Sequence, residues 1–218
     1  MQDSLIDDTV RFVKSTLINA EAGHDWWHIN RVWLLSKKIA KKEHADLLVV
    51  ELAALLHDIA DSKFHNGNED IGPGMAANFL KVKNLSNQQK DHIVNIIRHI
   101  SFKNQFTDDH FESNELKIVQ DADRLDAIGA IGIARAFNYG GYKNRIFYDP
   151  EFPPQIYDTK EAYQKSDSPT INHFYEKLLL LKDLMHTETA KKIAIERHEF
   201  MLQYLEHFYK EWNVETDI

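Results

Sequence analysis

Ala54-Leu55-Leu56-His57-Asp58-Ile59-Ala60-Asp61-Ser62-Lys63 is the stretch around which the fold and the candidate site are organised. An apolar run leads directly into a His-Asp pair, and a second carboxylate and a lysine follow within a few residues. Apolar side chains on all sides bury such a helix and fix its backbone. The polar groups then arrive together where the helix ends. The stretch therefore predicts a site at the end of a buried helix.

A buried central helix is predicted over residues 45–60, because nearly every side chain before the His-Asp pair is apolar. Helical spacing of apolar residues predicts helices elsewhere in the chain as well. We expect these further helices over 5–20, 26–43, 75–83, 87–100, 115–137, 169–186 and 188–212. Strand patterns, internal repeats and low-complexity tracts are absent from the sequence. The sequence therefore predicts an all-α fold, with a single domain over residues 1–218.

Capping residues predict where several of these helices begin. Asp25 offers an N-cap for the second predicted helix, and Thr187 does so for the last one. Ser86 followed by Gln89 matches the capping box, in which two side chains satisfy backbone groups at the start of a helix. Gly72-Pro73-Gly74 is expected to separate the central helix from the short helix that follows it.

A long irregular loop is predicted over 138–170, which is rich in glycine, proline and tyrosine and has few periodic apolar residues. Loops of that length inside compact domains are often lids or binding loops. Tyr142 and Arg145 could stack on a base and hold a phosphate there, although aromatic residues also simply pin loops to a core. The small residues of the helix over 115–137 would let neighbouring helices approach closely. The C-terminal helices are expected over 171–212.

Composition narrows the classes of function. The 218 residues carry a formal net charge of −8, which disfavours a broad nucleic-acid or anionic-membrane surface because either partner would require a basic face. The sequence has no cysteine, so any metal site must use His, Asp or Glu ligands. It shows neither a signal-peptide hydrophobic run nor an apolar stretch long enough to span a bilayer. We therefore expect a cytoplasmic protein without a membrane or an extended nucleic acid as partner.

Three places along the chain carry residues that suit a metal site: His28, His57-Asp58 and the acidic run 121–126. His28 precedes apolar residues of its helix by four, seven and eleven positions, so it shares their buried stripe. His57 likewise follows Val50 and Ala53 by seven and four positions. A buried imidazole needs a partner, and for either histidine alone an ordinary hydrogen bond in the core would suffice. Together, two imidazoles and two carboxylates would suit a borderline-to-hard divalent cation.

The same three places resemble the H…HD…D signature of the HD-domain metal-dependent phosphohydrolases. His28-Ile29-Asn30-Arg31-Val32 looks like the H-x-x-R-V motif of that family, and Leu55-Leu56-His57-Asp58-Ile59 looks like its L-L-H-D-I motif. Asp121-Ala122-Asp123-Arg124-Leu125 is similar to its D-A-D-R-L motif. The resemblance covers about residues 20–137, the expected metal-site core. More narrowly, the chain resembles small stand-alone bacterial members associated with nucleotide phosphohydrolase or pyrophosphohydrolase activity.

The resemblance implies that His28, His57, Asp58 and Asp123 bind the metal. The family pattern selects Asp123 within the acidic run, with Asp126 as the reserve ligand because it shares a helix face with Asp123. One divalent cation is expected, and Mn²⁺, Mg²⁺, Co²⁺, Ni²⁺ and Fe²⁺ all suit such a ligand set.

Other residues are assigned to catalysis and substrate binding. Members of the family often carry a catalytic carboxylate at the position of Asp61, which we expect to accept or relay a proton; the alternative is a solvated aspartate after the helix. Lys63 would suit phosphate oxygens beside a metal. For several further basic residues a solvated helix face is the alternative to substrate binding. Residues expected to bind substrate are His24, Arg98, Lys103, Arg124, Tyr142 and Arg145.

A zinc-protease interpretation of His24-Asp25-x-x-His28 is disfavoured. Residues four apart share a helix face, as they do in the H-E-x-x-H motif of zinc proteases. However, the Asp25 cap places His24 just outside the helix, and aspartate is a poor replacement for the glutamate base.

These assignments predict a metal-dependent phosphohydrolase that acts on a phosphorylated small molecule. The leading substrate is a nucleoside or deoxynucleoside triphosphate, cleaved to the monophosphate and pyrophosphate. Nucleoside monophosphate dephosphorylation and guanosine-alarmone hydrolysis are the closest alternatives. The alternative from another class is a regulatory module that binds a nucleotide or metal without turnover. A homodimer that pairs the C-terminal helices also stays open.

Overall fold

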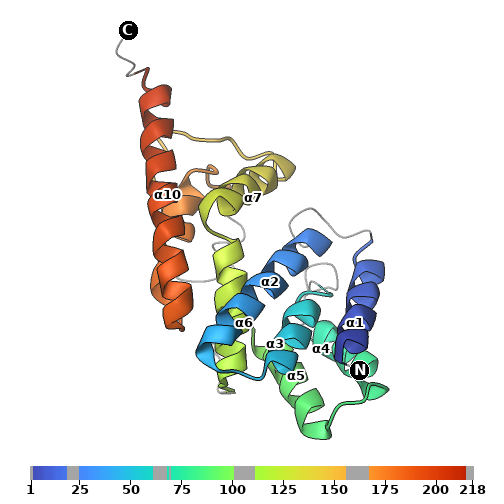
Figure 1. Cartoon of the computed structure of the whole chain (residues 1–218). Coiled ribbons are helices and arrows are strands. Elements are labelled where there is room, and N and C mark those ends of the chain that lie inside the picture. The colour runs from blue at the N-terminus through green and yellow to red at the C-terminus, as the bar shows by residue number, and fades with distance from the viewer. Residues whose placement is uncertain are drawn as a thin grey trace. The chain divides into compact units, whose positions relative to one another are not determined.

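The computed structural model describes residues 2–18, 25–60, 68, 70–100, 111–155 and 167–214. Every regular element in these residues is a helix, and no strand occurs among them (Figure 1). The all-α prediction is therefore confirmed. Within the same residues, no helix is long and apolar enough to cross a membrane. The chain divides into two compact units, Met1–Asp123 and Arg124–Ile218. That the whole chain folds as one domain stays a prediction.

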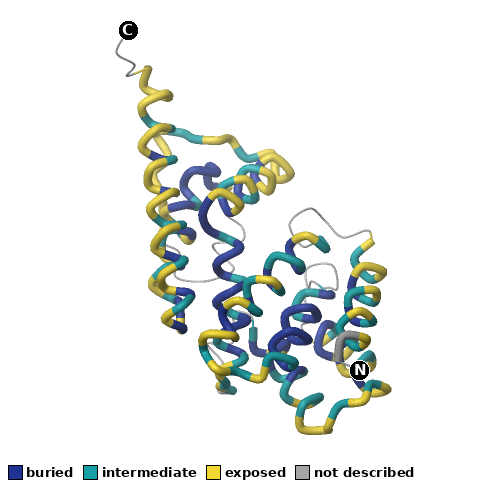
Figure 2. The backbone as a smooth tube through the Cα atoms, in the orientation of Figure 1, coloured by how far each residue is buried: buried dark blue, intermediate teal, exposed yellow. Residues whose placement is uncertain are grey.

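The first unit is organised around its third helix. Its helices are α1 (Gln2–Thr16), α2 (Trp26–Glu43), α3 (Leu47–Leu56), α4 (Ile71–Lys81), α5 (Asn87–His99) and all but the last three residues of α6 (Asn114–Asp126). Helix α3 packs against α1, α2 and α5. Its residues from Val49 to Leu56 are all buried, as the dark blue of this helix in Figure 2 shows. The prediction of a buried central helix is confirmed, since a helix that is apolar all round is stable only when covered on every side. Its predicted end at residue 60 was wrong, because α3 ends at Leu56 and residues 57–60 form a turn and bend.

Side-chain caps fix where the helices of the first unit begin. The Asp25 carboxylate accepts a hydrogen bond from the backbone N–H of His28 at 3.0 Å, so the predicted cap of α2 is confirmed. Ser86 and Gln89 form both halves of the predicted capping box at the start of α5. Asp46 caps α3 in the same way, although this cap was not predicted. Each cap satisfies backbone donors that a helix start leaves without an intrahelical partner.

The second unit packs shorter helices against one long helix. Its elements after α6 are α7 (Gly129–Tyr142), α9 (Asn172–Glu176), the 3₁₀ helix η3 (Leu178–Leu184) and α10 (Glu188–Trp212). Helix α10 packs against α7 and η3, and Thr187 caps it as predicted. The ring of Phe137 contacts those of Phe174 and Tyr204, with centroids 6.2 Å away in each case. Aromatic packing therefore joins α7, α9 and α10.

The long loop is shorter than predicted and is partly pinned. The prediction of a loop from residue 138 was wrong at its start, because α7 continues to Tyr142. Backbone N–H groups of Thr170 and Ile171 donate to the carbonyl groups of residues 146 and 147, each at 2.9 Å. The ring of Tyr148 lies against three aromatic rings of α10. These are Phe208, Tyr209 and Trp212. Backbone hydrogen bonds and ring contacts therefore hold residues 146–148 of this loop against the second unit. Residues 156–166 lie outside the described part of the chain.

The prediction of one continuous helix over 115–137 was wrong. The chain turns at Ala127-Ile128, between α6 and α7, and Gly129 has a φ of +76°. A side chain at that φ would be strained, so glycine is needed where α7 begins. A Cβ atom at Gly132 would collide with the carbonyl group of Ala127. The small residues of this region therefore serve a tight turn, in addition to any close helix packing.

Two further helix boundaries differ from the predictions. Helix α4 begins at Ile71, so Gly72-Pro73-Gly74 lies inside its first turn and does not separate it from the preceding helix. Proline is tolerated there because N–H groups in the first turn have no intrahelical acceptor. The helix predicted over 169–186 is instead α9 followed by η3, with Lys177 between them at φ −146° and ψ −57°.

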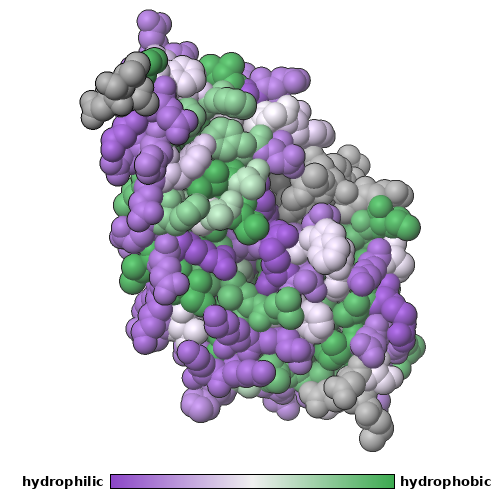
Figure 3. Space-filling view, turned by 45° about the horizontal axis from the view of Figure 1, so that its top comes forward, coloured by the Kyte–Doolittle hydropathy of each residue, from purple (hydrophilic) through white to green (hydrophobic). Residues whose placement is uncertain are grey.

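Some large apolar side chains stay exposed, chiefly in the second unit. Figure 3 shows apolar side chains in patches among hydrophilic ones on the face that it presents. On α10 the exposed large apolar residues are Ile195, Phe200, Leu202 and Trp212. Scattered exposure of this kind is normal for a folded chain, so it does not by itself define an interface.

Candidate metal centre

Three helices of the first unit bring the predicted metal ligands together. His28 lies in the first turn of α2, and Asp123 lies in the last turn of α6. His57 and Asp58 directly follow the last residue of α3. The buried stripe of α2 and the apolar body of α3 direct the two histidines inward, while the Asp25 cap holds the turn that carries His28.

The four side chains converge on a small volume. His28 Nε2 lies 3.5 Å from Asp123 Oδ1 and 3.9 Å from Asp58 Oδ2. His57 Nε2 lies 3.9 Å from the same oxygen of Asp123. The two imidazole centroids are 5.3 Å apart, and one ligand atom from each of His28, His57 and Asp58 lies within 4.8 Å of the others. Asp123 is not part of that group of three, but its Oδ1 lies within 3.9 Å of both imidazole nitrogens, so the two histidines and the two carboxylates are candidate ligands of a single cation.

The four candidate ligands differ in exposure: the two histidines are shielded from solvent, whereas the two aspartates are partly exposed. The side chains of His28 and His57 are only 2% and 4% exposed. The side chain of Asp58 is 20% exposed and that of Asp123 is 42% exposed. The nitrogen donors are thus shielded, whereas solvent reaches the carboxylates. Water or a dissolved ligand could approach from the carboxylate side.

The state of His57 fits a metal ligand. Its Nδ1 lies 2.8 Å from the carbonyl oxygen of Ala54, which only accepts, so Nδ1 carries the proton and Nε2 presents a lone pair. Nε2 is buried and has no hydrogen-bond partner among the described residues. Burial lowers the pKa of His57, although the charge of Asp123 opposes this effect, so the ring stays neutral near pH 7. A buried nitrogen lone pair beside the carboxylate of Asp123 is costly unless a cation binds it.

Several predicted residues lie outside the described part of the chain. His24, Asp61, Lys63 and Lys103 are among them, so their predicted roles stay predictions. Arg98 is described: its exposed guanidinium lies 3.7 Å from a carboxylate oxygen of Asp70. Its role in substrate binding also stays a prediction.

The remaining predicted substrate residues belong to the second unit. Arg124 is buried, and its guanidinium donates to the carbonyl oxygen of Leu184 at 2.6 Å. Tyr142 is exposed, with the ammonium of Lys143 5.3 Å from its ring centroid. The guanidinium of Arg145 lies 5.8 Å from the ring centroid of Tyr139. The contact of Arg124 supports the fold of its unit, and substrate binding by Arg124, Tyr142 and Arg145 stays a prediction.

One further carboxylate, that of Asp126, and one further imidazole, that of His99, have partners within the fold. Asp126, the reserve ligand, is buried and forms an ion pair with Arg135. His99 is buried, and its Nδ1 lies 2.8 Å from the carbonyl oxygen of Asn95. These contacts account for the burial of both side chains and favour Asp123 as the carboxylate ligand from α6.

Side chains of α6 tie the ligand-bearing helices together through contacts that were not predicted. Asn114, in the first turn of α6, donates through its side chain to the carbonyl oxygen of Glu43 at the end of α2 (2.8 Å). Glu115 accepts a hydrogen bond from the backbone N–H of Asp46, at the start of α3 (3.0 Å). About seventy residues separate the partners in each pair, so no local pattern could have revealed them.

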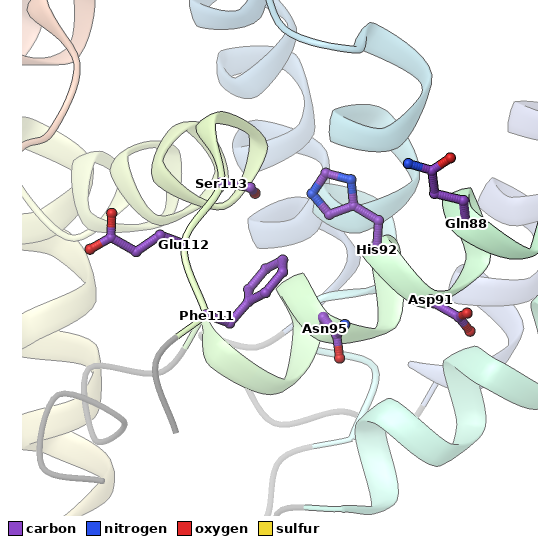
Figure 4. A pocket seen from close by; sticks show the side chains of 7 residues that line it. All are labelled: Gln88, Asp91, His92, Asn95, Phe111, Glu112 and Ser113. Carbon is purple, nitrogen blue, oxygen red and sulfur yellow. The ribbon is translucent and has the colours of Figure 1, made fainter. Parts of the chain in front are cut away.

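A hollow of about 620 Å³ lies beside α5 (Figure 4). The ring of His92 meets that of Phe111 edge to face with centroids 5.8 Å apart, and His92 Nε2 lies 3.5 Å from Glu115 Oε2. The residues that line the hollow are Gln88, Asp91, His92, Asn95, Phe111, Glu112 and Ser113. None of them was predicted for the site.

Comparisons with known proteins match most of the chain. A family model described as "HD domain" matches residues 26–128, which include all four candidate ligands. The uncharacterized protein YpgQ of Bacillus subtilis (strain 168) is 40% identical over 202 residues, which cover 92% of this chain and 90% of YpgQ. A crystal structure of an HD-superfamily hydrolase from Bacillus thuringiensis is 42% identical with a TM-score of 0.79, covering 98% and 99% of the two chains. The crystal structure of YpgQ in complex with ADP is 39% identical with a TM-score of 0.75, covering 96% of each chain.

Proposed function

Since the chain belongs to the HD-domain family, we propose that it is a metal-dependent phosphohydrolase that cleaves nucleoside or deoxynucleoside triphosphates to the monophosphate and pyrophosphate. The observation that carries the proposal is the convergence of two histidines and two aspartates within the segment that the family model matches. A shielded nitrogen side and an open carboxylate side suit a cation that must also contact water and substrate.

His28, His57, Asp58 and Asp123 would hold one divalent cation. When bound, such a cation lowers the pKa of water and offsets negative charge on a phosphate. The chain contributes the rest of the chemistry. The carbonyl of Ala54 holds His57 in the tautomer that presents Nε2 to the site. Partial exposure of Asp123 leaves room for water and a phosphate oxygen on that side.

Two residues outside the described part complete the proposed mechanism. Asp61 would accept the proton of the attacking water, because members of the family often carry a catalytic carboxylate at this position and carboxylates can act as general bases. Lys63 would hold a phosphate oxygen as negative charge develops in the transition state. Arg98, Lys103, Arg124, Tyr142, Arg145 and His24 remain the proposed substrate contacts.

A nucleotide substrate is supported by a relative, and the charge of the chain explains why a cation would be needed to bind it. YpgQ has been crystallised in complex with ADP, which points to a phosphorylated nucleotide as ligand for a chain 39% identical to it. The net charge of −8 would repel a polyanion, so a local cation is needed for such a ligand to bind. Monophosphate dephosphorylation and guanosine-alarmone hydrolysis are the alternatives for the substrate. A cytoplasmic location and a homodimer formed through the C-terminal helices stay predictions.

Release of phosphate and pyrophosphate from a nucleotide panel tests the proposal. The panel is run with Mn²⁺, Mg²⁺, Co²⁺ and Ni²⁺, and pyrophosphate release from a triphosphate is expected with at least one of them. His57→Ala and Asp123→Ala should abolish turnover, whereas His207→Ala, which removes an exposed histidine from α10, should not. Turnover that survives both substitutions would show that the site is wrongly assigned. A folded, metal-loaded chain without any turnover would instead support a regulatory module that binds without catalysis.

Asp61→Asn tests the assignment of the proton acceptor separately. It should lower kcat by about 10²- to 10⁴-fold, the usual contribution of a general base. Because Asp61 is not a proposed ligand, affinity for the cation should stay near the wild-type value. Unchanged kcat would exclude Asp61 from proton transfer without affecting the metal assignment.

A further inference from the structure

The C-terminal end of α6 contacts an arginine that lies far from it in the sequence, Arg197. At this end, the backbone N–H groups of Ala127 and Ile128 bond to the carbonyls of Arg124 and Leu125 (3.1 and 3.2 Å) as the chain turns. The guanidinium of Arg197, from α10, also donates to the carbonyl oxygen of Leu125. The Leu125 carbonyl thus accepts from the turn and from Arg197 together, through its two lone pairs, and a cation at a helix C-terminus also complements the helix dipole. Arg197 is therefore a side-chain cap for the C-terminal end of α6.

The surroundings of Arg197 fit this cap closely. Burial lowers the pKa of the Arg197 guanidinium, while the charge of Asp126 opposes this effect. A Cβ atom at Gly129 would lie 2.9 Å from Cγ of Arg197, so the absence of a side chain at this glycine leaves room for the arginine. A half-buried cation is stable only where acceptors and negative charge surround it. The Leu125 carbonyl and the Asp126 carboxylate supply both.

Two further arginines hold the same helix end. Arg135 forms an ion pair with the buried carboxylate of Asp126, and Arg124 donates to the carbonyl of Leu184 at 2.6 Å. Neither of these contacts uses the carbonyl of Leu125, which Arg197 reaches from α10. The last turn of α6 is thus fixed by side chains that come from α7 and α10 as well as from α6.

Asp123 lies in this last turn, two residues before Leu125. If the turn frays, the backbone of Asp123 and the direction of its carboxylate are no longer fixed. We propose that Arg197 is a positioning residue that orders the last turn of α6 and so sets the affinity of the metal centre through Asp123. The inference rests on the proposed function, because it takes Asp123 as a ligand. Outer partners that orient metal ligands affect metal affinity without touching the ion.

A double-mutant cycle with Mn²⁺ tests this role. Affinity for Mn²⁺ is measured by calorimetry on the metal-free full chain for the wild type, Arg197→Gln, Asp123→Ala and the double variant. Arg197→Gln is expected to weaken Mn²⁺ binding by about 10-fold in the wild-type background, the low end of the effect of losing a partner bonded to a ligand, because Arg197 acts through the backbone. In the Asp123→Ala background it should change affinity by less than about 2-fold, because the group through which it acts is gone. Lys192→Gln, which removes an exposed cation from the same helix, should match the wild type.

Other outcomes would overturn the proposal in distinguishable ways. Equal losses in both backgrounds would mean that Arg197 acts through general stability and not through Asp123. No loss in the wild-type background would exclude the positioning role while leaving the proposed function intact. If Asp123→Ala itself left Mn²⁺ affinity unchanged, Asp123 would not be a ligand, and both the site and this proposal would fail. Should Arg197→Gln not fold, the same cycle is run with Arg197→Lys, which keeps the charge and a donor, and the same dependence on Asp123 is expected.

Discussion

Acidification from pH 7 to pH 5 is expected to destabilise the protein through His173, and His173→Gln should remove that effect. His173 lies in α9, and burial lowers the pKa of its imidazole from 6.5 to about 3. The charges of Lys177 and Arg145 contribute a smaller part of this same shift. The folded state therefore keeps the ring neutral at pH 5, whereas most unfolded chains bind a proton there. Because the unfolded state binds more protons between these two pKa values, stability falls as the pH falls through this range.

The magnitude follows from the two pKa values. Between pH 7 and pH 5, this one linkage lowers the free energy of unfolding by about 2 kcal/mol. Urea unfolding of the metal-free chain at both pH values measures the wild-type loss, and the same experiment on His173→Gln should give a loss smaller by about 2 kcal/mol. His207→Gln, which removes an exposed histidine, serves as the control and should retain the wild-type loss. Equal losses in the wild type and His173→Gln would refute the reasoning, because the imidazole would then titrate alike in both states.

Two further substitutions and the addition of Mn²⁺ are expected to change the stability of the protein. Gly129→Ala should lower the free energy of unfolding by about 1–2 kcal/mol or more in urea, because of its positive φ and because the new Cβ would lie 2.9 Å from Cγ of Arg197. Gly141→Ala, with no atom within 4 Å of the new Cβ, should not lower it and serves as the matched control. Asp25→Ala should cost about 1 kcal/mol in thermal unfolding through loss of the α2 cap, and Asp25→Ser should recover most of it; equal losses would argue against capping. Mn²⁺ at about 100 times its Kd should stabilise the wild type by about 2.7 kcal/mol, and His57→Ala should show no such gain if the site is assigned correctly.

Local features of the sequence predicted most of the helices, and they singled out side chains that the structure brings close together. Asp25 and Ser86 could be predicted as caps because capping depends on residues within one turn. His28 and His57 could be placed on buried faces because apolar periodicity reports which side of a helix is covered. The family motifs then indicated Asp123 among the neighbouring aspartates, and the structure places its carboxylate 3.5 Å from His28 Nε2.

What the sequence could not predict depends on contacts between distant residues. Gly129 and Gly132 favour the turn after α6. Small residues also suit close packing of helices, so the sequence alone does not distinguish a turn from a continuous helix. Arg197 reaches the carbonyl of Leu125 across 72 residues, and no periodicity records such a pair. The position of Pro73 inside α4 was missed because a proline between glycines usually indicates a break, whereas in a first turn it is tolerated.

Binding of Mn²⁺ to the metal-free chain tests the central claim most directly. Titration followed by electron paramagnetic resonance reports free Mn²⁺, and one tightly bound ion per chain is expected for the wild type. His57→Ala should weaken that binding on the order of 100-fold or more, since loss of a ligand exceeds the effect of losing an outer partner. His207→Ala should leave it unchanged. A wild-type chain that binds no Mn²⁺, or a His57→Ala chain that binds it as tightly, would contradict the assignment of the metal centre.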